Sequence, residues 1–263
     1  MALAAGLFAS IAAGVIGTYV VVKRIVFIAG SIAHSVLGGM GLFLFLKRSY
    51  GIEWLIPIQG AFLFAIGSAL LIGWIRLHYK EREDTVIAAI WSTGMAIGVV
   101  FVSLTPGYNV ELMNFLFGNI LWVSSSDLWM LLGLDVLVLV LVAIFHRRFL
   151  AICFDEEQAL LQGVPVKSLY LLLLSLVAIS VVVLIQIVGA ILVISMLAIP
   201  AAIAGSITHR LSTMMWIAVL LGWIFTLLGT TIAYQLNWPL GATIALTAAL
   251  VYLLSRLFPM RSF

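Results

Sequence analysis

Long apolar segments alternate with short polar ones along most of the chain. Each apolar segment is about 20 residues long, enough for a helix to cross a hydrocarbon layer roughly 30 Å thick. Helices are expected because a segment in lipid must satisfy its backbone hydrogen bonds internally. The alternating segments of about ten residues that are typical of a β-barrel are not seen. The pattern predicts nine spans, at residues 3–22, 25–46, 54–75, 86–104, 127–145, 169–187, 188–207, 212–234 and 240–255.

The sixth and seventh spans lie in one uncharged segment, residues 169–207. A single helix of that length would measure roughly 58 Å at about 1.5 Å per residue. Because this is about twice the membrane core of roughly 30 Å, we predict a break between Gln186 and Gly189, where a polar side chain and a glycine permit a tight turn. Eight spans are the alternative, if these two segments or the short last one do not cross separately.

Composition supports a membrane protein. Hydrophobic residues make up 65% of the 263 residues, charged residues only 9%, and the mean hydropathy is +1.28, whereas soluble domains carry about 25% charged residues. The sequence therefore predicts an all-α, polytopic transmembrane helical bundle of eight or nine spans, with residues 1–263 as one domain. The lipid bilayer is its solvent. The first 22 residues lack the basic start and cleavage site of a secretory signal, so we expect a retained span.

The positive charges indicate an orientation. The net charge of +3 could suggest nucleic acid, but the basic residues lie at the ends of apolar spans, so we expect no nucleic-acid partner. Only Lys47 and Arg48 lie in one set of alternate loops, and the other eleven of the 13 Lys and Arg residues lie in the other set. Because basic residues favour the cytoplasmic side, we predict an external N-terminus and a cytoplasmic C-terminus. The single cysteine, Cys153, excludes an internal disulfide and a CxxC metal site.

Two connections are unusual. Residues 105–126 contain an apolar stretch too short to span, which suggests a re-entrant or interfacial helix on the outer side, and Asp127 is placed to favour the dipole of the next helix. Residues 146–167, on the cytoplasmic side, are long enough for a short helix along the membrane surface. Its acidic start is at Asp155, and Gly163 is its expected end. A solvated loop is the alternative for this second segment.

His34 and Asp135 are ionisable residues well inside predicted spans. Such residues are rare at that depth and usually face a cavity or a partner. An imidazole is also a good ligand for divalent zinc, manganese or iron, so His34 is a candidate metal ligand, and a packing histidine is the alternative. Asp135 could attract cations toward a pathway, but a packing or interfacial carboxylate is the interpretation that we favour for it.

Ser195, Met196 and Pro200 lie within the seventh span. Ser195 and Met196 could offer weak or soft contacts to a passing ion, although both are also ordinary packing residues. Pro200 removes a backbone hydrogen bond and kinks its helix. Transporters use such breaks as gates or joints, and a fixed structural kink is the alternative.

Four segments resemble, in order and spacing, the permease subunits of the ABC-3 family, which are zinc, manganese and iron importers. Residues 188–204, VGAILVISMLAIPAAIA, carry the strongest similarity. The segments MNFLFGN at 113–119, FDEEQALLQGV at 154–164 and GSIAHSVLG at 30–38 are similar to further family segments. The resemblance covers nearly the whole chain. One position departs from the pattern, because Gly30 stands where the family has an acidic residue four positions before the histidine.

The resemblance implies a permease subunit of an ATP-binding-cassette importer that carries a divalent metal ion by alternating access. It places His34 on the ion path and residues 154–164 in a coupling helix that docks on a separate ATPase. It further implies a homodimer, two copies of the ATP-binding subunit and an extracytoplasmic metal-binding protein, in the plasma membrane of a prokaryote. The residues expected to contact the ATPase are Phe154, Asp155, Glu156, Glu157, Ala159, Gly163 and Val164.

No GxxxxGK[ST] phosphate-binding loop occurs in the sequence. We therefore expect no ATP and no resident cofactor on this chain, and no enzymatic activity of its own. A proton-coupled secondary transporter is the alternative function, although it would be expected to show inverted repeats with broken helices. An intramembrane protease would need a HExxH-like pair or a serine in a glycine-rich frame with a partner base. His34, His78, His146 and His209 supply no such arrangement.

Overall fold

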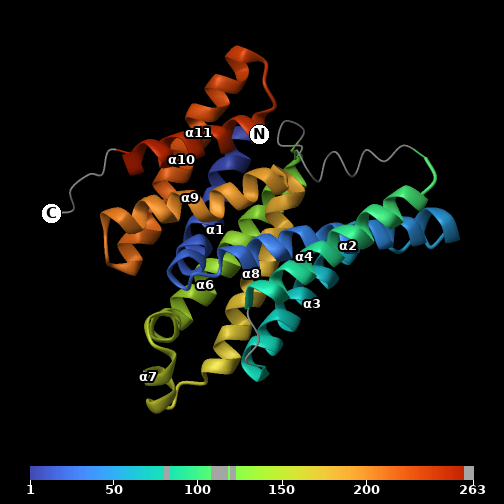
Figure 1. Ribbon diagram of the computed structural model, residues 1–263. Coiled ribbons are helices and arrows are strands. Elements are labelled where there is room, and N and C mark those ends of the chain that lie inside the picture. The colour runs from blue at the N-terminus through green and yellow to red at the C-terminus, as the bar shows by residue number, and fades with distance from the viewer. Residues whose placement is uncertain (80–82, 108–117, 119–122, 258–263) are drawn as a thin grey trace. The chain divides into compact units, whose positions relative to one another are not determined.

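The computed structural model describes residues 1–79, 83–107, 118 and 123–257. The described part of the chain is helical and contains no strand, which confirms the predicted all-α class (Figure 1). The helices are α1 (Ala2–Val22), α2 (Val26–Tyr50), α3 (Pro57–His78), α4 (Glu83–Leu104), α6 (Ser125–Phe154), α7 (Glu156–Leu161), α8 (Val166–Val188), α9 (Ala190–Ile207), α10 (Leu211–Leu236) and α11 (Leu240–Leu257).

Nine of these helices within the described residues are long and apolar enough to span a membrane, so the chain is a multi-pass membrane protein. The predicted break in the uncharged segment occurs at Gly189, between α8 and α9. Its φ of 85° lies in the left-handed region, which glycine adopts without steric cost because it has no Cβ. The two segments are therefore separate helices, and each is long and apolar enough to be a span of its own.

Helix α6 is longer than predicted. The fifth span was expected to end at residue 145, before three basic residues, but the helix continues to Phe154. Its last two turns are held against the end of α1, because the Phe149 ring lies 5.4 Å from the Tyr19 ring and the Tyr19 hydroxyl is 3.1 Å from His146 Nδ1. The start of α6 is as predicted, since Ser124 Oγ accepts a hydrogen bond from the Asp127 N–H. This cap satisfies one of the unpaired N–H groups of the first turn. The predicted re-entrant segment falls largely on residues 108–117 and 119–122, outside the described residues.

The chain divides into two compact units. The first contains residues 1–26, 116–155 and 183–263. In it α1 packs against α6, α9 and α10, and α11 packs against α9 and α10. Backbones approach closely at small residues: a Cβ at Gly17 would lie 2.1 Å from the Leu197 carbonyl oxygen, and one at Gly14 would lie 2.8 Å from the Val219 nitrogen. Small residues at interfaces permit such contact, which is a main source of helix association in lipid.

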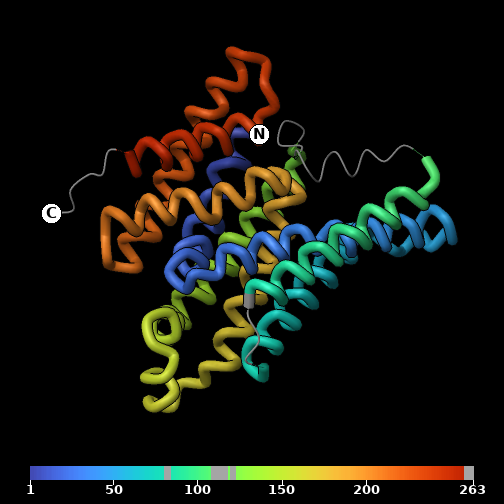
Figure 2. The backbone as a smooth tube through the Cα atoms, viewed as in Figure 1, coloured from blue at the N-terminus to red at the C-terminus, as the bar shows by residue number. Residues whose placement is uncertain are grey.

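The second unit contains residues 27–115 and 156–182, so it includes α2, α3, α4, α7 and most of α8. Figure 2 shows α2, α3 and α4 running beside one another. A Cβ at Gly39 of α2 would lie 1.9 Å from the Gly60 oxygen of α3, and one at Gly38 would lie 2.8 Å from the Gly94 oxygen of α4. Glycines therefore set the distances between these three helices.

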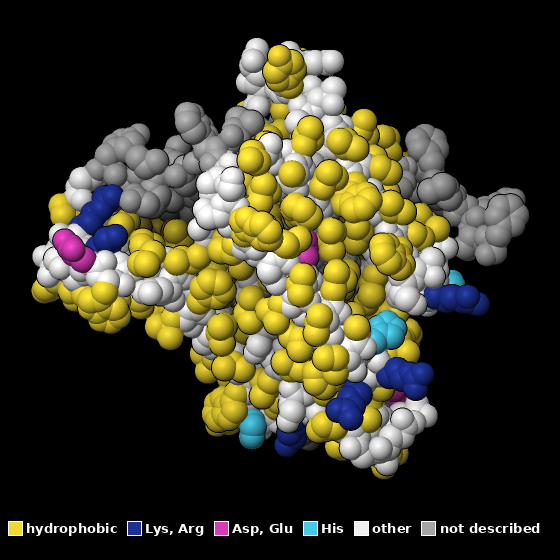
Figure 3. All heavy atoms as spheres, turned by 180° about the vertical axis from the view of Figure 1, so that it is seen from behind, with side chains coloured by type: hydrophobic (Ala, Val, Ile, Leu, Met, Phe, Trp, Pro, Cys, Tyr) yellow, Lys and Arg dark blue, Asp and Glu magenta, His cyan; other side chains and the backbone are white. Residues whose placement is uncertain are grey.

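Large apolar side chains cover much of the outside of the spans. On α6, for example, Val136 is 54% exposed and Ile144 is 66% exposed. Figure 3 shows one face of the molecule, on which hydrophobic side chains predominate and charged side chains form a few small groups. A surface of this kind is suited to lipid rather than to water.

Candidate functional site

His34 lies in the first half of α2, as its ninth residue, in the second unit, and faces α4. Its imidazole stacks on the indole of Trp91, with ring centroids 4.5 Å apart and an angle of 13° between the planes. The two helices can approach there because Gly94 of α4 lies against Ser35 of α2. A Cβ at Gly94 would be 2.6 Å from the Ser35 Cα. The close approach therefore brings an aromatic face against one side of the candidate ligand.

Neither ring nitrogen of His34 forms a hydrogen bond with another described residue. The lone pair of a neutral imidazole nitrogen can therefore bind a metal ion without first breaking a contact within the protein. At Gly30, one turn before His34, a Cβ would meet only the Trp91 ring, at 3.8 Å. Position 30 thus has room for a larger side chain, and the absent carboxylate leaves His34 without an acidic neighbour there.

Asp135 belongs to the first unit and is 4% exposed. Its Oδ1 accepts a hydrogen bond from the backbone N–H of Ala12 on α1, at 3.1 Å, and its Oδ2 has no hydrogen-bond partner in the described structure. The contact joins α6 to the middle of α1, which fits the interpretation of Asp135 as a packing residue. A buried carboxyl with one open oxygen nevertheless keeps the capacity to accept a proton or a cation.

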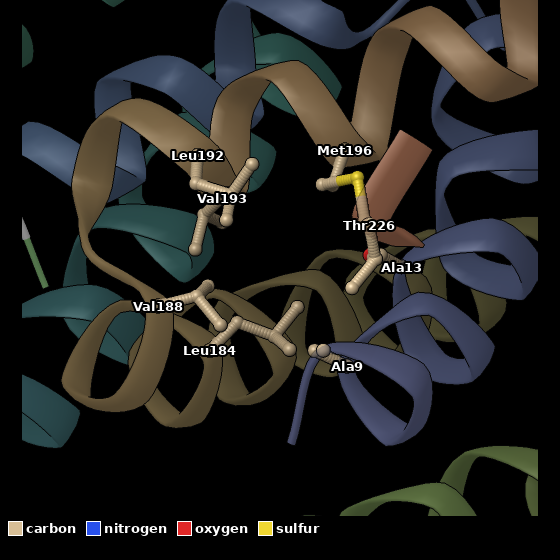
Figure 4. A pocket seen from close by; sticks show the side chains of 9 residues that line it. Ala9, Ala13, Leu184, Val188, Leu192, Val193, Met196 and Thr226 are labelled. Carbon is tan, nitrogen blue, oxygen red and sulfur yellow. The ribbon is translucent and has the colours of Figure 1, made fainter. Parts of the chain in front are cut away.

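Ser195, Met196 and Pro200 are placed on α9, also in the first unit. Met196 lines a small cavity between α1, the end of α8, α9 and α10, and Figure 4 shows its thioether beside Thr226. The Ser195 Oγ and Thr226 Oγ1 atoms are buried without a hydrogen-bond partner. Pro200 lies inside the helix, so it cannot donate the N–H that the carbonyl of Met196 would otherwise receive.

This cavity is small and mostly apolar. It leaves about 10 Å³ for the centre of a water-sized sphere, which is near the lower limit for holding one water molecule. Apart from Met196 and Thr226, it is lined by Gly6, Ala9, Ala13, Leu184, Val188, Leu192 and Val193. Among the described residues, no group of three or more His, Cys, Asp or Glu side chains could hold a metal ion. The candidate ligands therefore do not form a closed site of the resident type.

The predicted coupling segment contains a short helix. Residues 146–154 belong to α6, Asp155 follows them, and α7 begins at Glu156 and ends at Leu161. The chain then turns at Gly163, whose φ is 76°, and the Val164 N–H donates to the Ala159 carbonyl at 3.0 Å. The helix and its glycine end were both anticipated from the acidic start and from Gly163.

Helix α7 is anchored on one side and exposed on the other. Glu156 forms an ion pair with Arg76 of α3 at 3.2 Å, and Ala159 is only 2% exposed. Leu160 and Leu161, by contrast, are 64% and 88% exposed. Phe154, at the end of α6, is 67% exposed. Exposed apolar side chains in a charged connection are typical of a surface that binds another protein.

Sequence reasoning missed two residues in these regions. Trp91 carried no signal, because aromatic residues are common within spans and its contact with His34 joins separate helices. Arg76 was recognised only as a topology signal, although it is a basic residue at the end of α3 and an acidic cluster occurs at 155–157. The complementary charge was visible, but the pairing could not be assigned without the fold.

Comparisons with known proteins agree with the fold. Residues 1–259 match the model of the family described as "ABC 3 transport family". A "Probable metal transport system membrane protein" of Chlamydia pneumoniae is 51% identical over 94% of this chain and 84% of its own length. The manganese transport system membrane protein MntC of Listeria innocua is 34% identical, over 94% of this chain and 86% of its own.

A solved structure is also similar. The structure titled "PsaBC from Streptococcus pneumoniae in complex with Fab" matches with a TM-score of 0.83 and 31% identity, covering 97% of this chain and 89% of that one. The family match extends over all of the described helices, from α1 to α11. This chain belongs to the ABC 3 transport family.

Proposed function

We propose that this chain is the membrane-spanning permease of an ATP-driven importer for a divalent transition-metal ion, with residues 1–263 acting as one permease domain. Family membership supports the importer class, and relatives named as manganese transport proteins support manganese as the first candidate ion. Zinc and iron are the next candidates, because they share ligand types with manganese. The observation that carries the metal assignment is the imidazole of His34 inside a span, with no hydrogen bond to a described residue.

The ion path in this proposal includes His34. A single neutral imidazole binds a divalent ion without adding charge to the membrane interior, and it can release the ion again. Asp135, Ser195 and Met196 are weaker candidates for contact with the ion, and Pro200 is a candidate joint for movement of α9. Each site on the path must bind the ion strongly enough for it to enter and weakly enough for it to leave. An incomplete set of ligands fits that requirement better than a closed cage.

Energy for transport would come from partners. The sequence has no P-loop, so ATP hydrolysis is assigned to two copies of a separate ATP-binding subunit, and an extracytoplasmic protein would deliver the ion to a homodimer of this chain. Helix α7 is the proposed docking element, since Leu160 and Leu161 are exposed and can enter an apolar groove of the ATPase. Movement of α7 would then expose the His34 region first outward and then inward.

The proposed location is a prokaryotic plasma membrane, with the N-terminus outside and the C-terminus in the cytoplasm. This orientation places eleven of the 13 Lys and Arg residues on the cytoplasmic side. It also places α7 on the side where ATP is available. Cysteine accessibility on intact cells, at single cysteines introduced near each end of the chain, would test it. Labelling of the C-terminal position from outside would contradict it.

The test of function is reconstitution in lipid vesicles with a candidate ATPase subunit and binding protein. We expect ATP-dependent uptake of Mn²⁺, in competition with Zn²⁺ and Fe²⁺, and a large loss of uptake in His34→Ala. The control is His209→Ala, because His209 is exposed between α9 and α10. Unchanged uptake in His34→Ala would remove His34 from the path. Uptake driven by a proton gradient without any ATPase would instead establish the secondary transporter.

A further inference from the structure

His34 lacks the contact that usually orients a metal-binding histidine. Such a histidine almost always donates its second ring N–H to a carboxylate, a carbonyl or a water, and this fixes the ring and raises its basicity. No described protein group accepts a hydrogen bond from either nitrogen of His34. Among the described residues, the protein contact that can orient the ring is therefore not a hydrogen bond but the stacked indole of Trp91.

The indole of Trp91 provides that support. The two rings are nearly parallel, at 13°, with centroids 4.5 Å apart, so the indole covers one face of the imidazole. Offset stacking of aromatic rings contributes beyond burial alone. The indole is itself held in place, because its Nε1–H donates to the Met95 Sδ at 3.2 Å, one turn further along α4.

Contacts between the two helices fix the register of this stack. On one side, Ser31 Oγ donates to the Ile87 carbonyl at 3.1 Å, one turn before His34 and Trp91. On the other side, a Cβ at Gly98 of α4 would lie 2.7 Å from the Leu37 carbonyl carbon of α2. Neither helix can slide by a turn without breaking these contacts. The stack is therefore set by the backbone packing of α2 and α4.

We propose that Trp91 is the positioning residue of the ion path: its indole orients the imidazole of His34 by stacking, in place of a hydrogen bond. This inference rests on the proposed function of His34. It has a chemical consequence, because a carboxylate partner would make the imidazole more basic and the metal bond stronger. A stacked imidazole presents a nitrogen in a fixed direction and keeps the weaker basicity that suits release of a transported ion.

The test measures metal binding by the full chain in lipid nanodiscs, with Zn²⁺ or Mn²⁺ alone as the probe and a chelating dye as competitor. Trp91→Leu removes the aromatic face, and we expect binding about tenfold weaker, the lower end of the effect of losing an orienting partner. Trp91→Phe retains an aromatic ring and should bind nearly as the wild type does. The matched control is Trp74→Leu, because Trp74 also lies against a histidine, His78, with ring centroids 5.3 Å apart.

A double-mutant cycle separates positioning from general damage to the fold. In a His34→Ala background, Trp91→Leu should cause no further loss of the affinity that remains, because residues that act through one contact are not additive. An equal loss with and without His34 would show a structural role and overturn the proposal, as would unchanged binding in Trp91→Leu. If His34→Ala alone leaves binding unchanged, both the ion path through His34 and this inference fail. If only Trp91→Leu is without effect, the role of Trp91 alone is refuted.

Discussion

Arg76→Ala should uncouple ATP hydrolysis from transport while leaving the protein folded. Arg76 lies near the end of α3, where its Nη2 is 3.2 Å from Glu156 Oε1 of α7 and its guanidinium lies 4.4 Å from the centre of the Tyr170 ring on α8. One side chain thus connects the proposed docking helix to two spans. A force applied to α7 by an ATPase would reach α3 and α8 through it.

The energies of these contacts explain why the fold should survive. The Arg76 and Glu156 side chains are 23% and 35% exposed, and a partly exposed ion pair is worth about 0.2–1 kcal/mol. The cation–π contact adds about 0.5–1 kcal/mol. Loss of both costs roughly 1–2 kcal/mol, within the ordinary range for a single substitution. Loss of these two contacts should therefore lower stability only modestly, whereas α7 loses its ion pair with α3.

The assay is the number of metal ions taken up per ATP hydrolysed by the reconstituted importer. We expect this ratio to fall in Arg76→Ala with hydrolysis maintained, and to recover in part when Arg76→Glu is combined with Glu156→Arg. Arg147→Ala is the control, because Arg147 is an exposed arginine of α6. An unchanged ratio in Arg76→Ala, with thermal unfolding confirming a folded protein, would refute the idea that force passes through this residue.

Four further substitutions, one of them a control, have defined outcomes. Gly17→Ala places a Cβ 2.1 Å from the backbone oxygen of Leu197, so it should lower the free energy of unfolding by about 1–3 kcal/mol. The control is Gly67→Ala, because a Cβ there meets nothing within 4 Å. In a thermal unfolding assay this control should be neutral or slightly stabilising. Gly30→Asp adds a carboxylate one turn before the candidate histidine, in a place with room for its Cβ. Because oxygen ligands suit manganese, this variant should bind Mn²⁺ more tightly relative to Zn²⁺ in a dye competition. Unchanged selectivity would contradict the placement of residue 30 beside the ion path. Asp135→Asn keeps the acceptor for the Ala12 N–H. If Asp135 is a packing residue, metal uptake should therefore stay close to that of the wild type. A large loss of uptake would instead establish a role for Asp135 on the ion path.

The sequence predicted the spans well because lipid imposes a simple rule on length and polarity. The length of the charge-free segment required a break, and Gln186 and Gly189 indicated where it would occur. The end of α6 was not predicted. Basic residues at 146–148 suggested a boundary, but burial of Phe149 and Ile152 continues the helix beyond them.

The candidate site was predicted only in part. His34 could be selected because an imidazole in the middle of a span is rare. Its stacking on Trp91 could not be predicted, because an aromatic residue within a span gives no indication of its partner. Arg76 and Glu156 illustrate the same limit, since opposite charges on two connections pair only when packing brings their helix ends together.

The single-residue connection at Gly189 also bears on how the chain enters the membrane. Between α8 and α9 there is one glycine and no charged side chain, so the insertion machinery finds no basic residue there with which to orient either helix. The nearest Lys and Arg residues are Lys167, at the start of α8, and Arg210, after α9. In the proposed orientation both stay in the cytoplasm while the two helices enter the membrane together. The topology of this pair is thus decided by its flanks, and a basic residue introduced beside Gly189 would compete with them during biogenesis.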